Sequence, residues 1–466
     1  MIAFACALLS GVGFYFSEGL GDQWCLAWLA PIPVLWFAFG PTKYWQSFLV
    51  AFFGFALGAS SLIRAYGGLM PLPVMILILS GPAVAFAVPM IAAKRVQQSF
   101  GGIAAMFAFA TLWAGIDLAS SFSAAGGATS SPSAAEIGAP IFIQTASLVG
   151  FAGVTFLLGA VAAGIAASLR SKSPAPAVIA VALFAANAAF GAIRMAAPPS
   201  GTMHVALIES DNAVGKTQRD DKEATLKAFN AYAAEIEKLR GKNVKLILLP
   251  ENIGWVGSAW RSEAQTTLAK AATVADATLV AGLNTYLDGA QRNAAWAFTP
   301  DDGTPVTYQK RRLIQGLETR FFTPGKQPVA LSNGAGLEIC KDMDFHAMIR
   351  GDEVATHPLL LAVPAWDFDI DDWSHGRVAL MRSVENGVPM VRNARDGLLT
   401  LNDRYGRIVA RAKTAGPFKT LIGDLPLDGR GGYTVYDRIG DVFGWLCLLL
   451  GIGATVLAFL KTKRAA

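Results

Sequence analysis

The sequence predicts a two-part protein: a multi-pass α-helical membrane domain and an α/β soluble domain. Of its 466 residues, 53% are hydrophobic and only 16% are charged, whereas a soluble chain usually has about 25% charged residues. The shortfall lies in residues 1–200 and near the C-terminus, while residues 201–435 have an ordinary soluble composition. Strand and helix patterns alternate in that soluble stretch. We therefore predict a membrane domain over 1–200, a soluble domain over 201–435, and a last membrane helix with a basic tail over 436–466.

Seven stretches of the first 200 residues are apolar and close to the length that spans a bilayer, and an eighth lies near the C-terminus. They cover about 2–17, 23–39, 44–67, 71–93, 101–122, 145–169, 175–195 and 439–460. With a cytoplasmic N-terminus, eight Lys and Arg residues lie at cytoplasmic helix ends and two at the opposite ends. Because positive residues stay on the cytoplasmic side, we expect a bacterial inner-membrane protein whose soluble domain faces the periplasm.

The soluble domain shows short apolar strands separated by amphipathic helices. In the first helix, Leu226, Phe229 and Ala233 recur at the spacing of one helix face. The predicted strands are 203–209, 244–249, 278–282, 294–298, 306–309, 336–339, 359–363 and 390–393, and the predicted helices are 221–239, 262–275 and 375–385. This order is typical of a sheet layered with helices.

Composition excludes several classes of protein. Four Cys residues in a chain of this length do not form a disulfide framework. The net charge of +5 is modest, and the basic residues form no stripe, so we expect no nucleic-acid partner. Five residues between Asp367 and His375 are acidic or His, but they lack the loop pattern of a cation site. We predict neither a metal nor another cofactor.

Three residues with complementary chemistry each end a predicted strand: Glu251, Lys310 and Cys340. Taken singly, each has an ordinary interpretation: a capping carboxylate, a solvated lysine and a small core residue. The ends of strands in one sheet can converge on one edge. There a buried carboxylate would serve as a general base, an ammonium would stabilise an oxyanion, and a thiol would be the nucleophile. We therefore predict a catalytic site made of these three residues.

The motifs around these residues resemble the Glu–Lys–Cys triad of the nitrilase (carbon–nitrogen hydrolase) superfamily. They read Leu249-Pro-Glu251, Tyr308-Gln-Lys-Arg-Arg-Leu313 and Ile339-Cys-Lys-Asp342. Glu318, eight residues after Lys310, matches a second essential Glu of the apolipoprotein N-acyltransferases. The segments Phe322-Thr-Pro-Gly325, Pro364-Ala-Trp366 with His375, and Met381 to Arg392 resemble later parts of that family. The membrane architecture also points to this family, and the likeness covers essentially the whole chain.

This resemblance implies a nitrilase-like α-β-β-α sandwich and a two-step acyl transfer. Cys340 would take an acyl chain from a phospholipid, and the thioester would pass it to the N-terminal amine of a diacylglyceryl-cysteine lipoprotein. Glu251 would move the protons, Lys310 would hold the oxyanion, and Glu318 would orient Lys310 or shape the pocket. Asp342 and Trp366 are predicted to support the site.

Supporting roles are also open for His375 and Trp255. Trp255 follows Glu251 closely, so it would line an acyl pocket or enter the membrane interface, and core packing is the equal alternative.

The sequence also departs from the acyltransferase pattern near the proposed chemistry. Lys341 stands where that family has Tyr. Asp342 replaces a Glu that helps to set the active site. Because the Asp side chain is shorter, the resemblance does not establish that Asp342 reaches the same partner as that Glu. Arg312 replaces a His, and Gln315 a Pro. These changes leave open an acyltransferase with a different amine acceptor or a membrane-anchored amidase. A scaffold without catalysis is a further alternative, and it is the weakest because Glu251, Lys310 and Cys340 all retain the required chemistry. We expect a monomer, because a membrane collar would obstruct assembly through the soluble domain.

Overall fold

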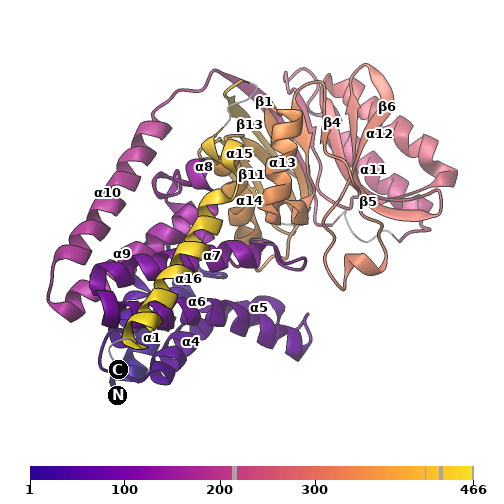
Figure 1. Ribbon diagram of the computed structural model, residues 1–466. Coiled ribbons are helices and arrows are strands. Elements are labelled where there is room, and N and C mark those ends of the chain that lie inside the picture. Colours follow the sequence, from indigo (N-terminus) through magenta and orange to yellow (C-terminus); the bar gives the residue numbers. More distant parts are fainter. Residues whose placement is uncertain (213–217, 415, 430–433, 464–466) are drawn as a thin grey trace. The chain divides into compact units, whose positions relative to one another are not determined.

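The computed structural model describes residues 1–212, 218–414, 416–429 and 434–463 (Figure 1). Contacts divide the chain into two compact units. One comprises Met1–Ala197 and Thr434–Ala466, and the other comprises Pro198–Tyr433. We refer to them as the membrane unit and the soluble unit.

Among its described residues, the membrane unit contains helices joined by turns and loops, and no strand. Its α-helices are α1 (Ile2–Ser17), α2 (Trp24–Leu29), α3 (Ile32–Ala38), α4 (Tyr44–Ala59), α5 (Ser61–Tyr66), α6 (Leu72–Phe100), α7 (Gly102–Ser121), α8 (Ala146–Val149), α9 (Phe151–Ser171), α10 (Ala175–Met195), α15 (Val435–Ile439) and α16 (Val442–Lys463). Two 3₁₀ helices, η1 (Pro132–Gly138) and η2 (Pro140–Phe142), follow α7. Among the described residues, α6, α7, α9, α10 and α16 are long and apolar enough to cross a membrane.

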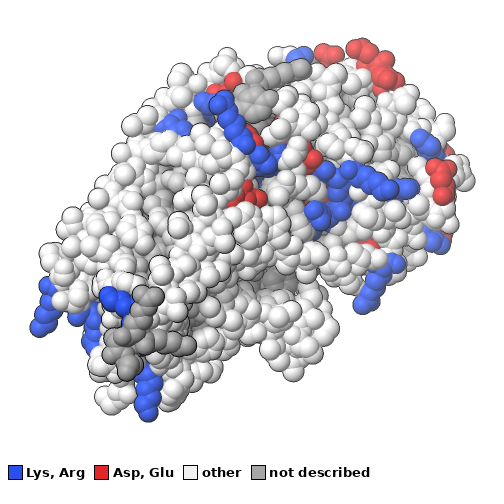
Figure 2. Space-filling view, in the orientation of Figure 1, with Lys and Arg blue, Asp and Glu red and all other residues white. Residues whose placement is uncertain are grey.

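The earlier apolar stretches form shorter helices. The predicted span 23–39 is divided at Pro31 into α2 and α3, because proline cannot donate to the hydrogen-bond ladder of a continuing helix. Aromatic side chains pack at the centre of the unit, where Phe86 makes edge-on contacts with Phe14, Phe109 and Trp113. On the face drawn in Figure 2, most of the surface over this unit carries no charged side chain, as expected for helices that meet lipid.

Two β-sheets form the centre of the soluble unit. The first has seven strands in the order β13-β1-β2-β4-β5-β6, with β3 paired to β4, and the second has six in the order β12-β11-β10-β9-β8-β7. The strands are β1 (Gly201–Glu209), β2 (Leu246–Leu248), β3 (Trp255–Gly257), β4 (Thr278–Leu287), β5 (Ala290–Thr299), β6 (Asp302–Gln309), β7 (Val329–Ala330), β8 (Ala335–Leu337), β9 (Leu360–Trp366), β10 (Met390–Arg395), β11 (Leu398–Asn402), β12 (Ile408–Lys413) and β13 (Lys419–Leu427).

The two sheets stack face to face, with helices on their outer sides. Because successive side chains of a strand point to opposite faces, Val205 and Leu207 of β1 join the core between the sheets. Ala206 and Ile208 instead pack under α11 (Lys222–Glu237) and α12 (Arg261–Ala275). On the second sheet, α14 (Asp372–Asn386) packs on β10 and β11, beside α13 (His346–Thr356). The predicted α-β-β-α arrangement is confirmed.

The sheets approach closely where the candidate site lies. Asn393 of β10 donates hydrogen bonds to the carbonyl oxygens of Ile208 (2.9 Å) and Leu248 (2.7 Å) in the first sheet. A Cβ atom on Gly282 would lie 2.5 Å from the Pro250 oxygen, so only glycine fits there. The Glu251 amide donates to the Ala365 oxygen of β9 (3.2 Å). These contacts hold the end of β2 against the end of β9.

Candidate active site

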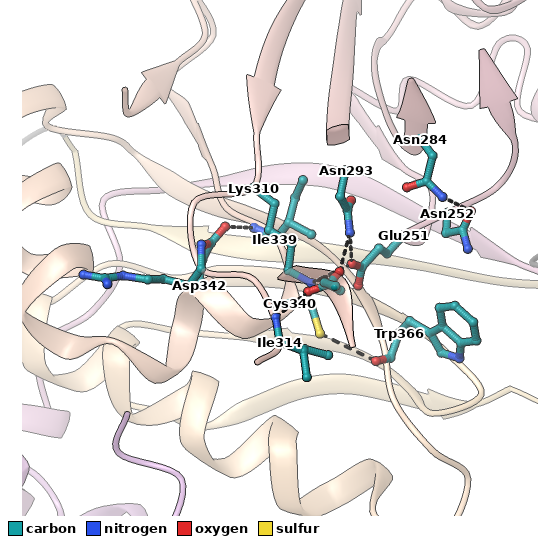
Figure 3. Close-up of polar contacts among 12 residues, drawn as sticks. Glu251, Asn252, Asn284, Asn293, Lys310, Ile314, Ile339, Cys340, Asp342 and Trp366 are labelled. Atoms are coloured by element: carbon teal, nitrogen blue, oxygen red, sulfur yellow. Dashed lines mark hydrogen bonds and ion pairs between the residues drawn. The ribbon is translucent and has the colours of Figure 1, made fainter. Parts of the chain in front are cut away.

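Glu251, Lys310 and Cys340 lie together at the ends of strands from both sheets (Figure 3). Glu251 follows β2, Lys310 follows β6, and Cys340 begins η5 (Cys340–Asp344) just after β8. The Lys310 Nζ lies 2.9 Å from the Glu251 Oε1, and both side chains are buried. Cys340 is partly exposed, and its thiol donates to the Trp366 carbonyl oxygen at 3.5 Å. The structure therefore brings all three residues to one edge of the fold.

Glu318 and Asn293 complete the surroundings of Lys310. The Glu318 Oε1 also lies 2.9 Å from the Lys310 Nζ, so the ammonium sits between two carboxylates. The Asn293 side-chain amide on β5 donates to Glu251 (2.5 Å) and to Glu318 (3.0 Å). Our sequence reasoning did not identify Asn293. A polar side chain just before the apolar run from Ala294 to Phe298 was the available signal.

The electrostatics of the cluster keep Lys310 charged. Burial alone would lower the pKa of Lys310, but the carboxylates of Glu251 and Glu318 raise it well above its usual value. Although burial opposes ionisation of Glu318, Lys310 lowers the pKa of that carboxyl. Burial, followed by the nearby Glu251 charge, raises the pKa of the Cys340 thiol well above its ordinary value, and Lys310 offsets part of this effect. The thiol is therefore protonated at neutral pH and needs a base to become a nucleophile.

Cys340 has a backbone conformation that most side chains avoid. Its φ of +44° lies in the left-handed region, where a residue other than glycine is strained. Asp342 stabilises the turn: its Oδ2 accepts from the Ile339 amide (3.1 Å), and its Oδ1 accepts from the amides of Arg311 (3.2 Å) and Arg312 (2.7 Å). The shorter side chain of Asp342 thus reaches the turn after Lys310 and ties it to the turn at Cys340.

A buried ion pair that we did not predict interacts electrostatically with the thiol. The Arg392 guanidinium on β10 donates twice to the Asp367 carboxylate, at 2.7 and 2.6 Å. Both side chains are buried, and the Asp367 charge raises the pKa of Arg392 although burial opposes this. Asp367 raises the pKa of the Cys340 thiol and Arg392 lowers it, so the effects of the two members of the pair on this pKa oppose each other.

The other members of the acidic stretch also have cationic or His partners. The His375 Nε2 on α14 lies 3.1 Å from the Asp371 Oδ2; burial alone would lower the pKa of His375, but Asp371 raises it. Lys413 lies 3.0 Å from Asp369 and 3.3 Å from Asp372. Among the described residues, no group of three or more His, Cys, Asp or Glu side chains is arranged to hold a metal.

The chain is similar in sequence to apolipoprotein N-acyltransferases. Residues 10–164 match the family model of the apolipoprotein N-acyltransferase N-terminal domain. An apolipoprotein N-acyltransferase of Geobacter metallireducens is 25% identical over 98% of this chain and 95% of its own length. The predicted resemblance to this family is confirmed. A relative of the same name from Thermotoga maritima is 27% identical over 33% of this chain and 31% of its own length.

Solved structures of carbon–nitrogen hydrolases also match part of the chain. A carbon–nitrogen hydrolase from Helicobacter pylori G27 is 17% identical, covers 48% of this chain and 89% of its own, and has a TM-score of 0.41. An amidase from Nesterenkonia sp. is 22% identical, covers 48% of this chain and 91% of its own, and has a TM-score of 0.40.

The two predicted tryptophans occupy different surroundings. Trp366, which is 38% exposed, is held by a hydrogen bond from its indole to Asp396 (3.0 Å) and by the Arg395 guanidinium, 3.9 Å from the ring centroid. Trp255 stacks on Phe322 with ring centroids 5.6 Å apart. Trp255 and Phe322 line a groove of about 780 Å³ together with the charged segment 218–223. Trp366 is thus fixed beside the thiol, and Trp255 belongs to the groove.

Proposed function

We propose that the soluble unit transfers a fatty acyl chain from a phospholipid, through a Cys340 thioester, to the N-terminal amine of a diacylglyceryl-cysteine lipoprotein. The observation that carries this proposal is the arrangement of a buried ammonium between two carboxylates beside a partly exposed thiol. The similarity to apolipoprotein N-acyltransferases over nearly the whole chain supports the choice of substrates.

In the first step, Glu251 takes the Cys340 proton, and the sulfur attacks the ester carbonyl of the phospholipid. The Lys310 ammonium stabilises the negative charge that develops on the carbonyl oxygen. When the intermediate collapses, the bond to the glycerol oxygen breaks, and Glu251 returns the proton to that oxygen. A lysophospholipid leaves, and the acyl chain remains on sulfur.

In the second step, the lipoprotein amine attacks the thioester carbonyl. Glu251 accepts the amine proton and passes it to the departing sulfur, so the amide forms and the free thiol is restored. Glu318 and Asn293 keep Lys310 and Glu251 in place through the contacts described above. The reaction needs no metal or organic cofactor.

The distribution of Lys and Arg supports a bacterial inner-membrane protein whose soluble unit faces the periplasm. A membrane-bound thioester meets little water, so an amine arriving in the bilayer plane competes well with hydrolysis. We propose that the protein works as a monomer.

The alternative is a membrane-anchored carbon–nitrogen hydrolase, or an acyltransferase with another amine acceptor. The identity of Lys341 favours it, because Lys341 replaces the family's Tyr directly after the nucleophile and forms an ion pair with Asp344 at 2.7 Å. Such a change beside the thiol would alter which acceptor fits.

An assay with purified protein, labelled phospholipid and a diacylated lipopeptide separates these functions. Acylated peptide without free fatty acid is the expected result, and mass spectrometry should find the acyl adduct on Cys340. Cys340→Ser should abolish turnover, and Glu251→Gln should block adduct formation. Release of ammonia from simple amides without lipid turnover would contradict acyl transfer, and an unaltered rate in either variant would contradict the roles given to these residues.

A further inference from the structure

A second buried carboxyl cluster lies directly behind the Cys340 turn. It contains Glu338, which follows β8, together with Tyr308, Arg311, Asp342 and Asp352 of α13. Glu338 is only 2% exposed and lies two residues before Cys340. The proposed reaction gives Glu338 no role, and our sequence reasoning did not identify it.

The phenol of Tyr308 makes more contacts than its single proton can supply. Its oxygen lies 2.8 Å from the Glu338 Oε2 and 2.7 Å from the Asp342 Oδ2. A phenol donates one hydrogen bond, so only one of these carboxyl oxygens can receive the phenol proton. The other contact requires a proton on the carboxyl group itself, because two oxygens at this distance without a proton between them repel each other.

The surrounding hydrogen bonds indicate which carboxyl holds that proton. Asp342, which lies beside Ile339 in Figure 3, accepts from the backbone amides of Ile339, Arg311 and Arg312. Three backbone donors strongly favour an ionised carboxylate. In the described part of the chain, the other side chain that donates to Glu338 is Arg311, at 3.1 and 3.3 Å, and Arg311 also pairs with Asp352. Glu338 therefore donates to the Tyr308 oxygen, and the Tyr308 proton goes to Asp342.

Charge balance leads to the same assignment. The cluster around Lys310 and the cluster behind the Cys340 turn together contain two cations, Lys310 and Arg311. Near these cations lie five carboxyl groups, those of Glu251, Glu318, Glu338, Asp342 and Asp352. Burial and the Asp342 charge raise the pKa of Glu338 well above its ordinary value. Burial raises the pKa of Asp342 only to about 6, because Tyr308 and Lys310 lower it. A proton on Glu338 thus relieves the excess of negative charge without disturbing the Asp342 contacts.

We propose that Glu338 is a positioning residue that carries a proton at neutral pH, and that its neutral carboxyl, acting through Tyr308 and Asp342, holds the Cys340 turn against the turn after Lys310. Asp342 binds both turns, so its orientation sets how the thiol faces the ammonium. The importance of this positioning for catalysis rests on the proposed function of Cys340. The presence of a proton on Glu338 is independent of that function.

Infrared spectroscopy of the full-length protein in detergent tests the proton directly. The spectrum at pH 7 should contain a protonated-carboxyl band that Glu338→Gln lacks. Loss of a carboxylate band in Glu338→Gln, or no change in the protonated-carboxyl region, would overturn the proposal. This measurement needs no substrate, so its outcome is independent of whether acyl transfer occurs.

Alkylation of Cys340 by iodoacetamide, followed by peptide mass spectrometry, tests the positioning. Glu338→Gln can still donate to Tyr308 and accept from Arg311, so its rate should stay within about twofold of the wild type. Glu338→Ala removes the carboxyl group that contacts both Tyr308 and Arg311, and it should change the rate at least about fivefold. Equal rates in Glu338→Ala and the wild type, or equal disturbance in both variants, would overturn the positioning role. If Glu338→Ala does not fold, Tyr308→Phe takes its place, because it removes the same bridge.

Discussion

Two buried acidic clusters of the soluble unit begin at the ends of neighbouring parallel strands, and they differ in their cationic partners. Glu209 is the last residue of β1, and Glu251 follows β2, which pairs with β1 in parallel. Glu251 lies 2.9 Å from the Lys310 ammonium. Glu209 is fully buried, and burial and the Asp211 charge raise its pKa to about 9.

The difference shows that a buried strand end does not by itself make a carboxylate a base. A cation within hydrogen-bond distance stabilises the charged form, whereas burial beside other acids stabilises the protonated form. Near Glu209 the guanidinium of Arg395 acts against the combined effect of burial, Asp211 and Asp396, and does not overcome it. Lys310 therefore distinguishes the candidate active site from an acidic cluster in the same sheet.

Removing Lys310 should have the largest effect. Lys310→Met leaves Glu251 and Glu318 buried without a cation, which should cost about 3–5 kcal/mol in the free energy of unfolding. It should also lower the rate of Cys340 acylation by about 10²- to 10³-fold, because the oxyanion loses its stabilising charge. Thermal unfolding and adduct formation by mass spectrometry measure the two effects.

The matched control is Lys326→Met, which removes an exposed lysine of the same domain. It should leave stability and acylation unchanged. If Lys310→Met were acylated at the wild-type rate, Lys310 would not be what distinguishes the Glu251 cluster from the Glu209 cluster.

Glu209 should make stability depend on pH. Its pKa in the folded protein is about 9, whereas an unfolded chain has a Glu pKa of about 4.3. Between these values the folded protein keeps a proton that the unfolded chain has released. The free energy of unfolding should therefore fall as pH rises, by up to about 1.4 kcal/mol per pH unit.

Glu209→Gln should remove this slope, so the variant should be more stable than the wild type at pH 8, and the difference should shrink toward pH 5. The apparent unfolding temperature of the purified protein at each pH measures this. Parallel curves for the two proteins would show that Glu209 is ionised, and the contrast with Glu251 would fail.

Asn293 should have the smallest effect of the three. Asn293→Ala removes the amide that joins Glu251 to Glu318 but leaves the lysine in place. We expect a loss of about 1–2 kcal/mol in stability and about a tenfold slower acylation. Asn230→Ala, at an exposed position on α11, is the control and should change neither quantity.

Much of the fold could be predicted from local patterns. The β-strand at 203–209 and the helix at 221–239 correspond to β1 and α11, because apolar residues repeat there with the period of the element. The predicted span 23–39 is divided in the structure, because Pro31 outweighs a continuous apolar composition. A hydropathy pattern predicts which segments are apolar enough to enter lipid. It does not show where a proline, which lacks a backbone N–H donor, interrupts a helix.

For the candidate site, the sequence alone determined which residues carry useful chemistry and that Glu251, Lys310 and Cys340 end strands, since motifs and apolar runs are local properties. Tertiary structure alone decided which charges are paired. Asn293, the Arg392–Asp367 pair and the carboxyl cluster behind Cys340 join residues separated by 25 or more positions. The ionisation of a buried group depends on such distant neighbours, because electrostatic interactions in a protein interior act through space and not along the chain.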